Sequence, residues 1–278
     1  MGVRIAVSTW SFHPELLSGK LTIEALLEFC RENHIDGLEV VDIDLIDISL
    51  EKLRDIKRQA DAMGIEISCL SLEHDLSRYS AEARQDDVNK VLRWMSYAQA
   101  LGVKLVRVFT GRDKVGVPYD QQAQWVYDGL TQLAAKAEEL QIDLVLENHN
   151  NICKSADEIL DVIEKIGSPR LFTCPDPYNY IWSNQEKRAI YKESIYDDIG
   201  KILPYAKNYH MKVTKVDDSG EDIYMDCGRW LNQMQEYGYE GYWTIEFSWP
   251  NREPEVDFLD EVGKAAKLLK KHLVLLGE

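Results

Sequence analysis

Eight short apolar runs alternate along the chain with eight longer segments of helical periodicity. The short runs are rich in β-branched residues and predict strands, whereas apolar residues at every third or fourth position predict helices. The predicted strands are Arg4–Trp10, Asp36–Val41, Ile65–Leu72, Val103–Phe109, Ile142–Leu146, Leu171–Asp176, Ala206–Val213 and Tyr242–Phe247. Strands that alternate with helices pair in parallel, and eight such units close a barrel. The sequence therefore predicts an α/β fold, a (β/α)8 barrel.

The domain organisation follows from the absence of any linker rich in Pro, Gly or Ser between these units. We expect residues 1–278 to form one domain. A doubly wound open sheet is the alternative fold, and it usually has a Gly-rich phosphate-binding loop after its first strand. Here that region reads Ser8-Thr9-Trp10-Ser11 and contains no Gly, which favours the barrel.

Local signals mark several helix boundaries. Thr22 is suited to cap the segment that follows it, and Gly64 is suited to end a helix that runs from Ser49 to Met63. Ser155 and Glu158 have the spacing of a capping box. Further helices are expected at Ala83–Leu101, Pro118–Leu140, Ser183–Pro204, Arg229–Tyr237 and Glu255–Leu273.

Four consecutive predicted strands end in polar side chains, namely Glu147, Asp176, His210 and Glu246. In barrels of this kind the functional groups sit at the carboxyl ends of the strands, so these four should converge. Carboxylates held together raise each other's pKa, and they need a cation unless they are protonated or splayed apart. A single acid at a strand end is more often a helix cap. Four in succession favour a divalent metal ion, and this donor set suits Mn, Mg, Co or Zn.

The composition narrows the class of partner. The chain has 32 basic and 48 acidic residues and a formal net charge of −16, which repels nucleic acid and anionic membrane surfaces. No stretch approaches the ~20 apolar residues of a membrane span, and the N-terminus lacks signal-peptide features. The five cysteines have no paired spacing and indicate reduced thiols. We therefore expect a cytoplasmic protein with a small-molecule substrate and no nucleic-acid or membrane partner.

The motifs at the strand ends resemble those of the xylose isomerase-like TIM barrels. That superfamily includes sugar isomerases, ketose 3-epimerases, inosose dehydratases and apurinic endonucleases. The matching motifs are LENH at Glu147, D-x-x-N from Asp176 to Asn179, H-x-K from His210 to Lys212, IEF at Glu246, STWSF in the opening strand, DGLEV around Glu39 and RVFTG from Arg107 to Gly111. The similarity spans nearly the whole chain. It implies that Glu147, Asp176, His210 and Glu246 are metal ligands and that Glu147 and Glu246 double as acid/base groups.

Two positions depart from the family pattern. The usual H-x-K-D continues here as His210-Met211-Lys212-Val213, so the final acid is missing. Asn179 stands where some epimerases place a substrate-binding His. These departures leave the sugar and the reaction subtype open.

The expected function is that of a metal-dependent isomerase or epimerase of a sugar or sugar phosphate. A divalent ion polarises the carbonyl and stabilises the enediolate formed when the neighbouring proton is removed. A carboxylate on each face would serve an epimerase, one carboxylate would serve aldose–ketose isomerisation, and departure of a β-hydroxyl would give dehydration. The alternatives are a dehydratase of a keto-polyol and a barrel that binds sugar without turnover. A nuclease is disfavoured because it needs a basic face for phosphates.

Further residues at strand exits are candidate substrate contacts: Trp10, His74, His149, Asn179 and Lys212. Each of three residues also has a competing interpretation. His74 could be an ordinary loop histidine, His149 could form a structural hydrogen bond, and Lys212 could be a solvent-exposed lysine. Glu39 and Arg107 are interpreted instead as a buried pair inside the barrel. Aromatic rings beside the strand exits could pack on the C–H face of a sugar, and these are Trp10, Phe12, Tyr178, Trp182 and Trp249.

The segment Tyr178–Tyr196 is longer than a barrel crossover requires. It carries five aromatic residues, Tyr178, Tyr180, Trp182, Tyr191 and Tyr196. Exposed aromatic residues in that number usually mark a binding surface. We expect the segment to be a lid or the contact surface of a homo-oligomer.

Overall fold

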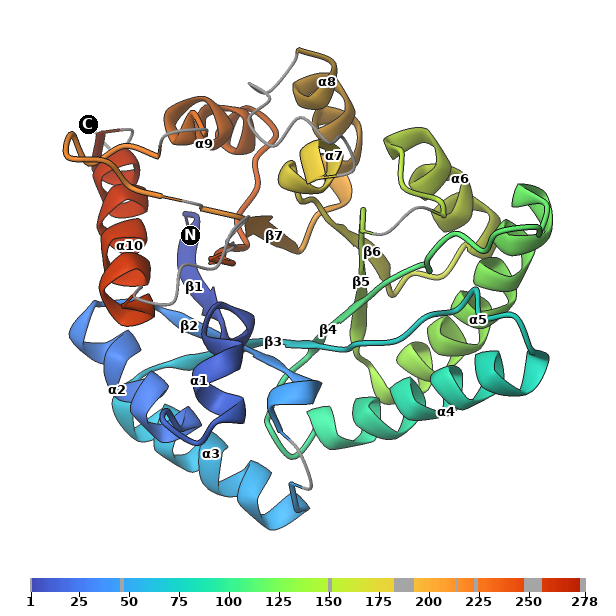
Figure 1. Cartoon of the computed structure of the whole chain (residues 1–278), viewed down its shortest axis with the longest axis horizontal. Helices are drawn as coiled ribbons and strands as arrows, with labels where there is room; N and C mark the ends of the chain where they lie inside the picture. Colours follow the sequence, from blue (N-terminus) through green and yellow to red (C-terminus); the bar gives the residue numbers. More distant parts are fainter. Residues whose placement is uncertain are drawn as a thin grey trace.

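A computed structural model describes residues 2–45, 48–149, 152–182, 193–213, 215–222, 225–247 and 257–275. Its strands stand around a common axis with the helices outside them (Figure 1). The strands are β1 (Arg4–Ser8), β2 (Gly37–Val41), β3 (Glu66–Ser71), β4 (Leu105–Val108), β5 (Asp143–Glu147), β6 (Leu171–Cys174), β7 (Asn208–Met211) and β8 (Tyr242–Ile245). Each falls within or next to a predicted run.

The strands form one eight-stranded parallel sheet in the order β6-β5-β4-β3-β2-β1-β8-β7. The β6 and β7 ends are joined by a parallel bridge between Thr173 and Ala206. Two backbone hydrogen bonds add to this seam: Lys207 N donates to Thr173 O at 3.1 Å, and His210 N donates to Pro175 O at 2.9 Å. The sheet is thus a nearly closed barrel, which confirms the predicted (β/α)8 fold. That 1–278 forms one domain stays a prediction.

The helices follow the strands in the predicted alternation. The longer ones are α2 (Ile23–Glu32), α3 (Leu50–Met63), α4 (Ala81–Ala98), α5 (Tyr119–Leu140), α6 (Ala156–Ile166), α8 (Glu193–Ile202), α9 (Cys227–Glu236) and α10 (Phe258–Leu275). The shorter ones are α1 (His13–Leu17), α7 (Tyr178–Trp182) and the 3-10 turns η1 (Thr9–Phe12), η2 (Asp42–Asp44) and η3 (Leu203–Tyr205). Among the residues that the structure describes, no helix is both long enough and apolar enough to cross a membrane.

The predicted helix signals are present as side-chain caps. Thr22 Oγ1 accepts a hydrogen bond from Ala25 N, and Ser155 and Glu158 form both bonds of a capping box. Gly64 ends α3 in the left-handed conformation, which costs little without a Cβ atom. Ser183, where a helix was predicted to begin, lies outside the described residues.

Several predicted strands end earlier than their apolar runs. The first was predicted to reach Trp10, but β1 ends at Ser8, whose side chain caps the 3-10 turn η1. The sixth was predicted to reach Asp176, but β6 ends at Cys174. The residue after Cys174 is Pro175, which has no N–H to donate to a sheet.

The apolar core lies mainly between the strands and the helices. A smaller cluster of Cys69, Val145 and Cys174, packed by Leu105 and Phe172, is separate from it. The five cysteines are all free, as predicted, and all are buried, so they act as small apolar side chains.

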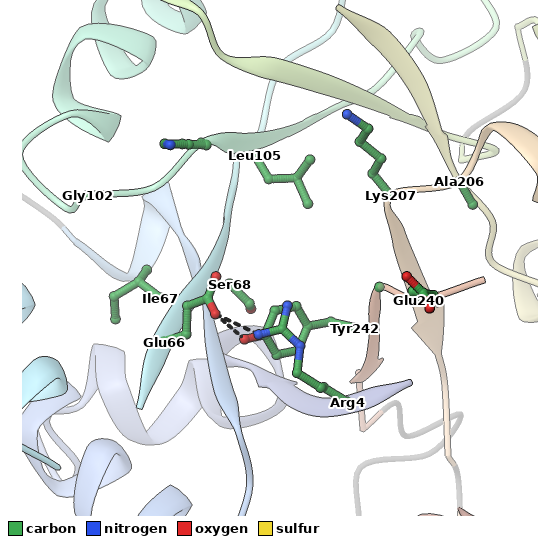
Figure 2. A pocket seen from close by; sticks show the side chains of 12 residues that line it. Arg4, Glu66, Ile67, Ser68, Gly102, Leu105, Ala206, Lys207, Glu240 and Tyr242 are labelled. Carbon is green, nitrogen blue, oxygen red and sulfur yellow. Dashed lines mark hydrogen bonds and ion pairs between the residues drawn. The ribbon is translucent and has the colours of Figure 1, made fainter. Parts of the chain in front are cut away.

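A cavity of about 510 Å³ lies at the amino ends of the strands (Figure 2). Arg4 Nη1 and the Tyr242 hydroxyl each donate to Glu66 Oε2 at 2.7 Å, as the dashed lines in Figure 2 mark. The Arg4 guanidinium also lies 4.0 Å from the centroid of the Tyr242 ring. These contacts tie β1, β3 and β8 together at the end of the barrel opposite the predicted site.

The expectation of an exposed aromatic segment at Tyr178–Tyr196 is wrong for Tyr178 and Tyr196, whereas Tyr180 is half-buried. Tyr178 and Tyr196 are buried, and Tyr196 stacks on Trp230 with ring centroids 3.9 Å apart. Burial of these rings favours packing between α8 and α9 over a free surface. Tyr191 and the side chain of Trp182 lie outside the part of the chain that the structure describes. The lid and oligomer roles therefore stay predictions.

Candidate functional site

The barrel brings the four predicted ligands together at the carboxyl ends of four adjacent strands. Glu147 is the last residue of β5, Asp176 follows β6, His210 lies in β7 and Glu246 follows β8. One donor atom from each lies within 4.8 Å of the others, and all four residues are buried. The convergence expected from strand order is therefore present in the structure.

Glu147 is held on two sides. Its Oε1 accepts a hydrogen bond from Asn179 Nδ2 at 2.8 Å, and its Oε2 lies 3.5 Å from Arg107 Nε. Burial by itself would raise the pKa of Glu147, but the neighbouring His210 and Lys212 lower it well below the usual range. Glu147 is therefore an ionised carboxylate with a fixed orientation.

Asp176 is positioned through its backbone as well as its side chain. The Asn148 side chain donates to Asp176 O at 2.8 Å and accepts from Asp176 N at 2.7 Å, which ties the ends of β5 and β6 together. Burial raises the pKa of Asp176 to about 6, Glu147 acts in the same direction, and Lys212 offsets them only in part. The site thus has more negative charge than its own cations neutralise.

Lys212 lies among the three carboxylates rather than in solvent. Its Nζ contacts Asp176 directly and lies 2.9 Å from Glu246 and 3.6 Å from Glu147. Burial opposes its charge, but the surrounding carboxylates, Asp176 foremost, raise the pKa of Lys212 well above the ordinary value. The interpretation of Lys212 as a solvent-exposed lysine is therefore wrong.

His210 has its two ring nitrogens in different surroundings. Nε2 lies 2.9 Å from Glu39 Oε2. Nδ1 faces the site, 3.4 Å from Glu246 Oε1 and 3.6 Å from Glu147 Oε2, and has no hydrogen-bond partner among the described residues. Burial opposes protonation, but Cys174 and Glu39 lead the groups that raise the pKa of His210 well above its usual value.

These observations meet what a divalent cation requires. Three carboxylates and one imidazole are held within reach of a common point, and the His210 Nδ1 atom is buried without a hydrogen-bond partner. Carboxylate oxygen and imidazole nitrogen are donors that Mn, Mg, Co and Zn ions accept. The residues at this site therefore fit a bound metal ion.

His149 and Arg107 line the same region. The His149 ring packs on Phe109 with centroids 4.4 Å apart, and its Nδ1 is buried without a hydrogen-bond partner in the described chain. Burial lowers the pKa of His149 to about 4, so this imidazole is neutral at pH 7. Arg107 stacks over the same Phe109 ring at 4.0 Å. Glu39 and Arg107 are both buried, as predicted, and Glu39 helps to raise the pKa of Arg107. Their shortest ion-pair contacts are to other residues, His210 for Glu39 and Glu147 for Arg107.

His74 is committed to the backbone. Its Nδ1 lies 3.0 Å from Leu72 O, and its Nε2 lies 3.1 Å from Phe109 O and 3.2 Å from Phe109 N. A neutral ring that donates from Nδ1 and accepts at Nε2 satisfies both neighbours. Neither nitrogen is left for a substrate, so these contacts favour a structural role in which His74 joins the ends of β3 and β4.

The aromatic residues at the strand exits divide in two. Phe12 is fully buried and packs edge-on against Phe29 at 5.8 Å, so it belongs to the core. Trp10 is half-buried in η1 and stacks on His13 at 4.9 Å. Trp10 therefore stays a candidate contact beside the mouth. Trp249 lies outside the described residues.

The sequence did not predict two contacts that organise the site. These are the hydrogen bonds of Asn148 with the backbone of Asp176 and the contact of Glu39 with His210. A signal for Glu39 was present, because a carboxylate in the middle of the buried run GLEVV needs a partner. The signal for Asn148 was its place directly after Glu147 on the opposite face of the strand. Neither signal identifies the partner.

An eight-stranded parallel barrel with a buried cluster of carboxylates and an imidazole at its carboxyl mouth defines a class of (β/α)8 proteins with a candidate metal site. Comparison by sequence refines this class. The xylose isomerase-like TIM barrel family matches residues 27–272, so the chain belongs to this family. No curated protein matches the sequence.

Solved structures of similar fold include sugar epimerases and a dehydratase. A 3-keto-D-glucoside 4-epimerase from E. coli superimposes with a TM-score of 0.74 at 16% identity, covering 96% of this chain and 99% of that chain. An L-ribulose 3-epimerase superimposes with a TM-score of 0.74 at 18% identity, covering 99% of this chain and 97% of that chain. A probable 3-DHS dehydratase from Bacillus anthracis superimposes with a TM-score of 0.71 at 14% identity, covering 99% of both chains. At these identities the shared property is the fold.

Proposed function

We propose that the protein is a divalent-metal-dependent isomerase or epimerase of a sugar or sugar phosphate, and that it acts by moving a proton next to a carbonyl group. The observation that carries this proposal is the convergence of Glu147, Asp176, His210 and Glu246, with donor atoms within 4.8 Å of one another. The epimerases of similar fold support the same chemical class.

The four converging residues would hold the metal ion. When bound, the ion would supply Lewis acidity toward the substrate carbonyl, which makes the neighbouring C–H bond more acidic. Mn, Mg, Co and Zn all suit this donor set.

Glu147 is the proposed base. Its carboxylate is kept ionised by neighbouring cationic groups, so it can accept a proton, and Asn179 and Arg107 hold its two oxygens in place. A base fixed in this way meets the geometric requirement for general base catalysis.

Glu246 is the proposed second acid/base group. It follows β8, whereas Glu147 ends β5, so the two carboxylates reach the site from different parts of the mouth. A substrate carbon between them would meet one carboxylate on each face, which an epimerase requires.

Lys212 and His149 are proposed to hold the substrate, with Asn179 and Trp10 at its edges. The Lys212 ammonium can donate to a substrate oxygen, and its place among the carboxylates keeps it in the site. The neutral His149 ring has a buried nitrogen available for a hydroxyl group.

Solvent deuterium exchange tests the proposal before the natural substrate is known. Protein loaded with Mn²⁺ is incubated in D₂O with a panel of ketoses, aldoses and their phosphates, and the sugars are analysed by mass spectrometry. We expect at least one sugar to take up one deuterium atom when the metal is present. This uptake should stop when a chelator removes the metal. No uptake into any sugar from protein with a saturated metal site would contradict the proposal and favour a barrel that only binds sugar.

A dehydratase of a keto-polyol is the second candidate. The probable dehydratase of similar fold favours it, and the same proton removal would serve if a β-hydroxyl then left. The two candidates separate by product: loss of water lowers the substrate mass by 18 Da, as the molar mass of water requires, whereas epimerisation leaves the mass in H₂O unchanged.

A further inference from the structure

A buried hydrogen-bond network leads from the site into the interior of the barrel. Glu39 on β2 is fully buried, and its Oε2 lies 2.9 Å from His210 Nε2 on β7. The same oxygen accepts a hydrogen bond from Asn208 Nδ2 at 2.8 Å. Asn208 Oδ1 in turn accepts from Thr244 Oγ1 at 2.9 Å. The network joins β2, β7 and β8 across the barrel.

This network decides which nitrogen of His210 faces the carboxylates. A neutral imidazole has one N–H, and a carboxylate can only accept. When a metal ion displaces one proton from His210, the proton that remains therefore belongs on Nε2, between the ring and Glu39. The lone pair is left on Nδ1, which lies 3.4 Å from Glu246 and has no hydrogen-bond partner in the described structure.

A carboxylate at this depth is costly to bury unless it is paired and hydrogen-bonded. The second oxygen of Glu39, Oε1, is buried without a hydrogen-bond partner among the described residues. Packing alone would favour an aliphatic side chain at this position of the apolar strand GLEVV. In the described part of the chain, the hydrogen bonds of Glu39 are those with His210 and Asn208.

We propose that Glu39 is a positioning residue for metal binding, which fixes the ring and the tautomer of His210 so that Nδ1 is the donor to the ion. This inference rests on the metal site of the proposed function. It assigns to Glu39 an effect on metal affinity, exerted through His210 and without contact to the ion or the substrate.

The test compares Mn²⁺ affinity in chelator-treated wild-type protein and the Glu39→Gln variant, measured from the electron paramagnetic resonance signal of free Mn²⁺. Glutamine keeps the size of the side chain and removes its charge, so the imidazole becomes a weaker donor. We expect the dissociation constant to rise about 10- to 100-fold, the range typical for residues that support a metal-bound histidine.

A matched control comes from a second, partly buried carboxylate–histidine pair. Asp44 Oδ1 lies 2.6 Å from His13 Nδ1, outside the four-residue cluster. The Asp44→Asn variant removes one charge from a similar pair, and its Mn²⁺ affinity should stay within about twofold of the wild-type value, because the effect requires contact with a ligand.

A structural readout separates positioning from a loss of fold. In Zn²⁺-loaded protein labelled with ¹⁵N-histidine, the wild type should show His210 protonated at Nε2 with a downfield, slowly exchanging proton. In Glu39→Gln that proton should shift upfield. Glu39→Asp keeps the charge but shortens the side chain, so it should also weaken Mn²⁺ binding, and it provides the test if the Gln variant does not fold.

The possible outcomes are distinct. Wild-type protein that binds no divalent ion overturns the proposed metal site and this inference together. Wild-type protein that binds Mn²⁺ while a folded Glu39 variant binds it within twofold, with an unchanged His210 spectrum, overturns the role of Glu39 alone.

Discussion

At the residue scale, the environment of each side chain decides its chemistry more than its type does. Glu147 and Glu66 are both glutamates paired with arginine. Glu147 is buried at the carboxyl mouth beside Lys212 and His210, whereas Glu66 is more than half exposed at the opposite end. The two residues therefore make a matched pair for mutation.

The Glu147→Gln variant should lose activity by about a hundredfold or more, because general acid–base groups contribute on this order. Glu246→Gln should lose a comparable amount, and the double variant should lose less than the product of the two losses if both residues serve one intermediate. Glu66→Gln is the control and should keep its turnover. Initial rates at saturating substrate, with circular dichroism to verify the fold, provide the measurement. Full turnover in both single site variants would leave them as ligands only.

His74 should make stability depend on pH on the acid side. Burial lowers the pKa of His74 below the ordinary histidine value of about 6.5, so below about pH 6.5 the unfolded chain binds a proton that the folded chain does not. The free energy of unfolding should therefore fall as the pH drops from 6.5, with a slope of at most about 1.4 kcal/mol per pH unit for one proton. Urea titrations of wild type and His74→Gln from pH 5 to 8 would show this. An identical pH slope in the two proteins would contradict it.

At the element scale, the site depends on how the ends of neighbouring strands are fixed. Asn148 forms two hydrogen bonds with the backbone of Asp176, so one side chain holds the residues beyond β5 and β6 in register. The buried position of Asn148 means that water cannot easily replace these bonds.

The Asn148→Ala variant should be destabilised by about 1–3 kcal/mol for each backbone group left without a partner. It should also bind Mn²⁺ more weakly, because Asp176 would lose its fixed orientation. Asn89→Ala, on the exposed face of α4, serves as the control. Urea denaturation measures the stability, and equal stability of the two variants would argue against the bridging role of Asn148.

The sequence predicted elements well where the signal is local. Thr22, Gly64 and the Ser155–Glu158 pair act through neighbours three or four residues away, and each was read correctly. The helix α7 escaped prediction because five residues are too few for a periodic pattern. That helix supplies Asn179, whose bond to Glu147 spans 32 positions in the chain.

At the scale of the whole molecule, the barrel geometry explains what could be predicted of the site. Glu147, Asp176, His210 and Glu246 were brought together correctly because consecutive strands are neighbours in a barrel. Glu39 was predicted to be buried inside the barrel, but its contact with His210 was not predicted, because it joins residues 171 positions apart across the barrel. Such a contact depends on side-chain length and depth, which a sequence pattern does not encode.

The β6–β7 seam should be the weakest part of the barrel wall, and metal should strengthen it. The seam has one bridge and two backbone hydrogen bonds, whereas β4 and β5 pair over four residues. Asp176 and His210 lie on opposite sides of it, so an ion held by both would join them. Hydrogen exchange followed by mass spectrometry should show faster exchange at Lys207 than in β5, slowed by Mn²⁺. Equal exchange with and without the ion would contradict this.

The central proposal is that Glu147, Asp176, His210 and Glu246 together hold a divalent ion. Calorimetric titration of Mn²⁺ into chelator-treated protein tests this most directly, with the His210→Ala variant in parallel. We expect one ion per chain in the wild type. Changing a residue that supports a metal ligand costs about 10- to 100-fold in affinity. We expect the His210→Ala variant, which removes a ligand itself, to lose more. Absence of stoichiometric binding for Mn²⁺, Mg²⁺, Co²⁺ and Zn²⁺ alike, or unchanged affinity in His210→Ala, would contradict the account.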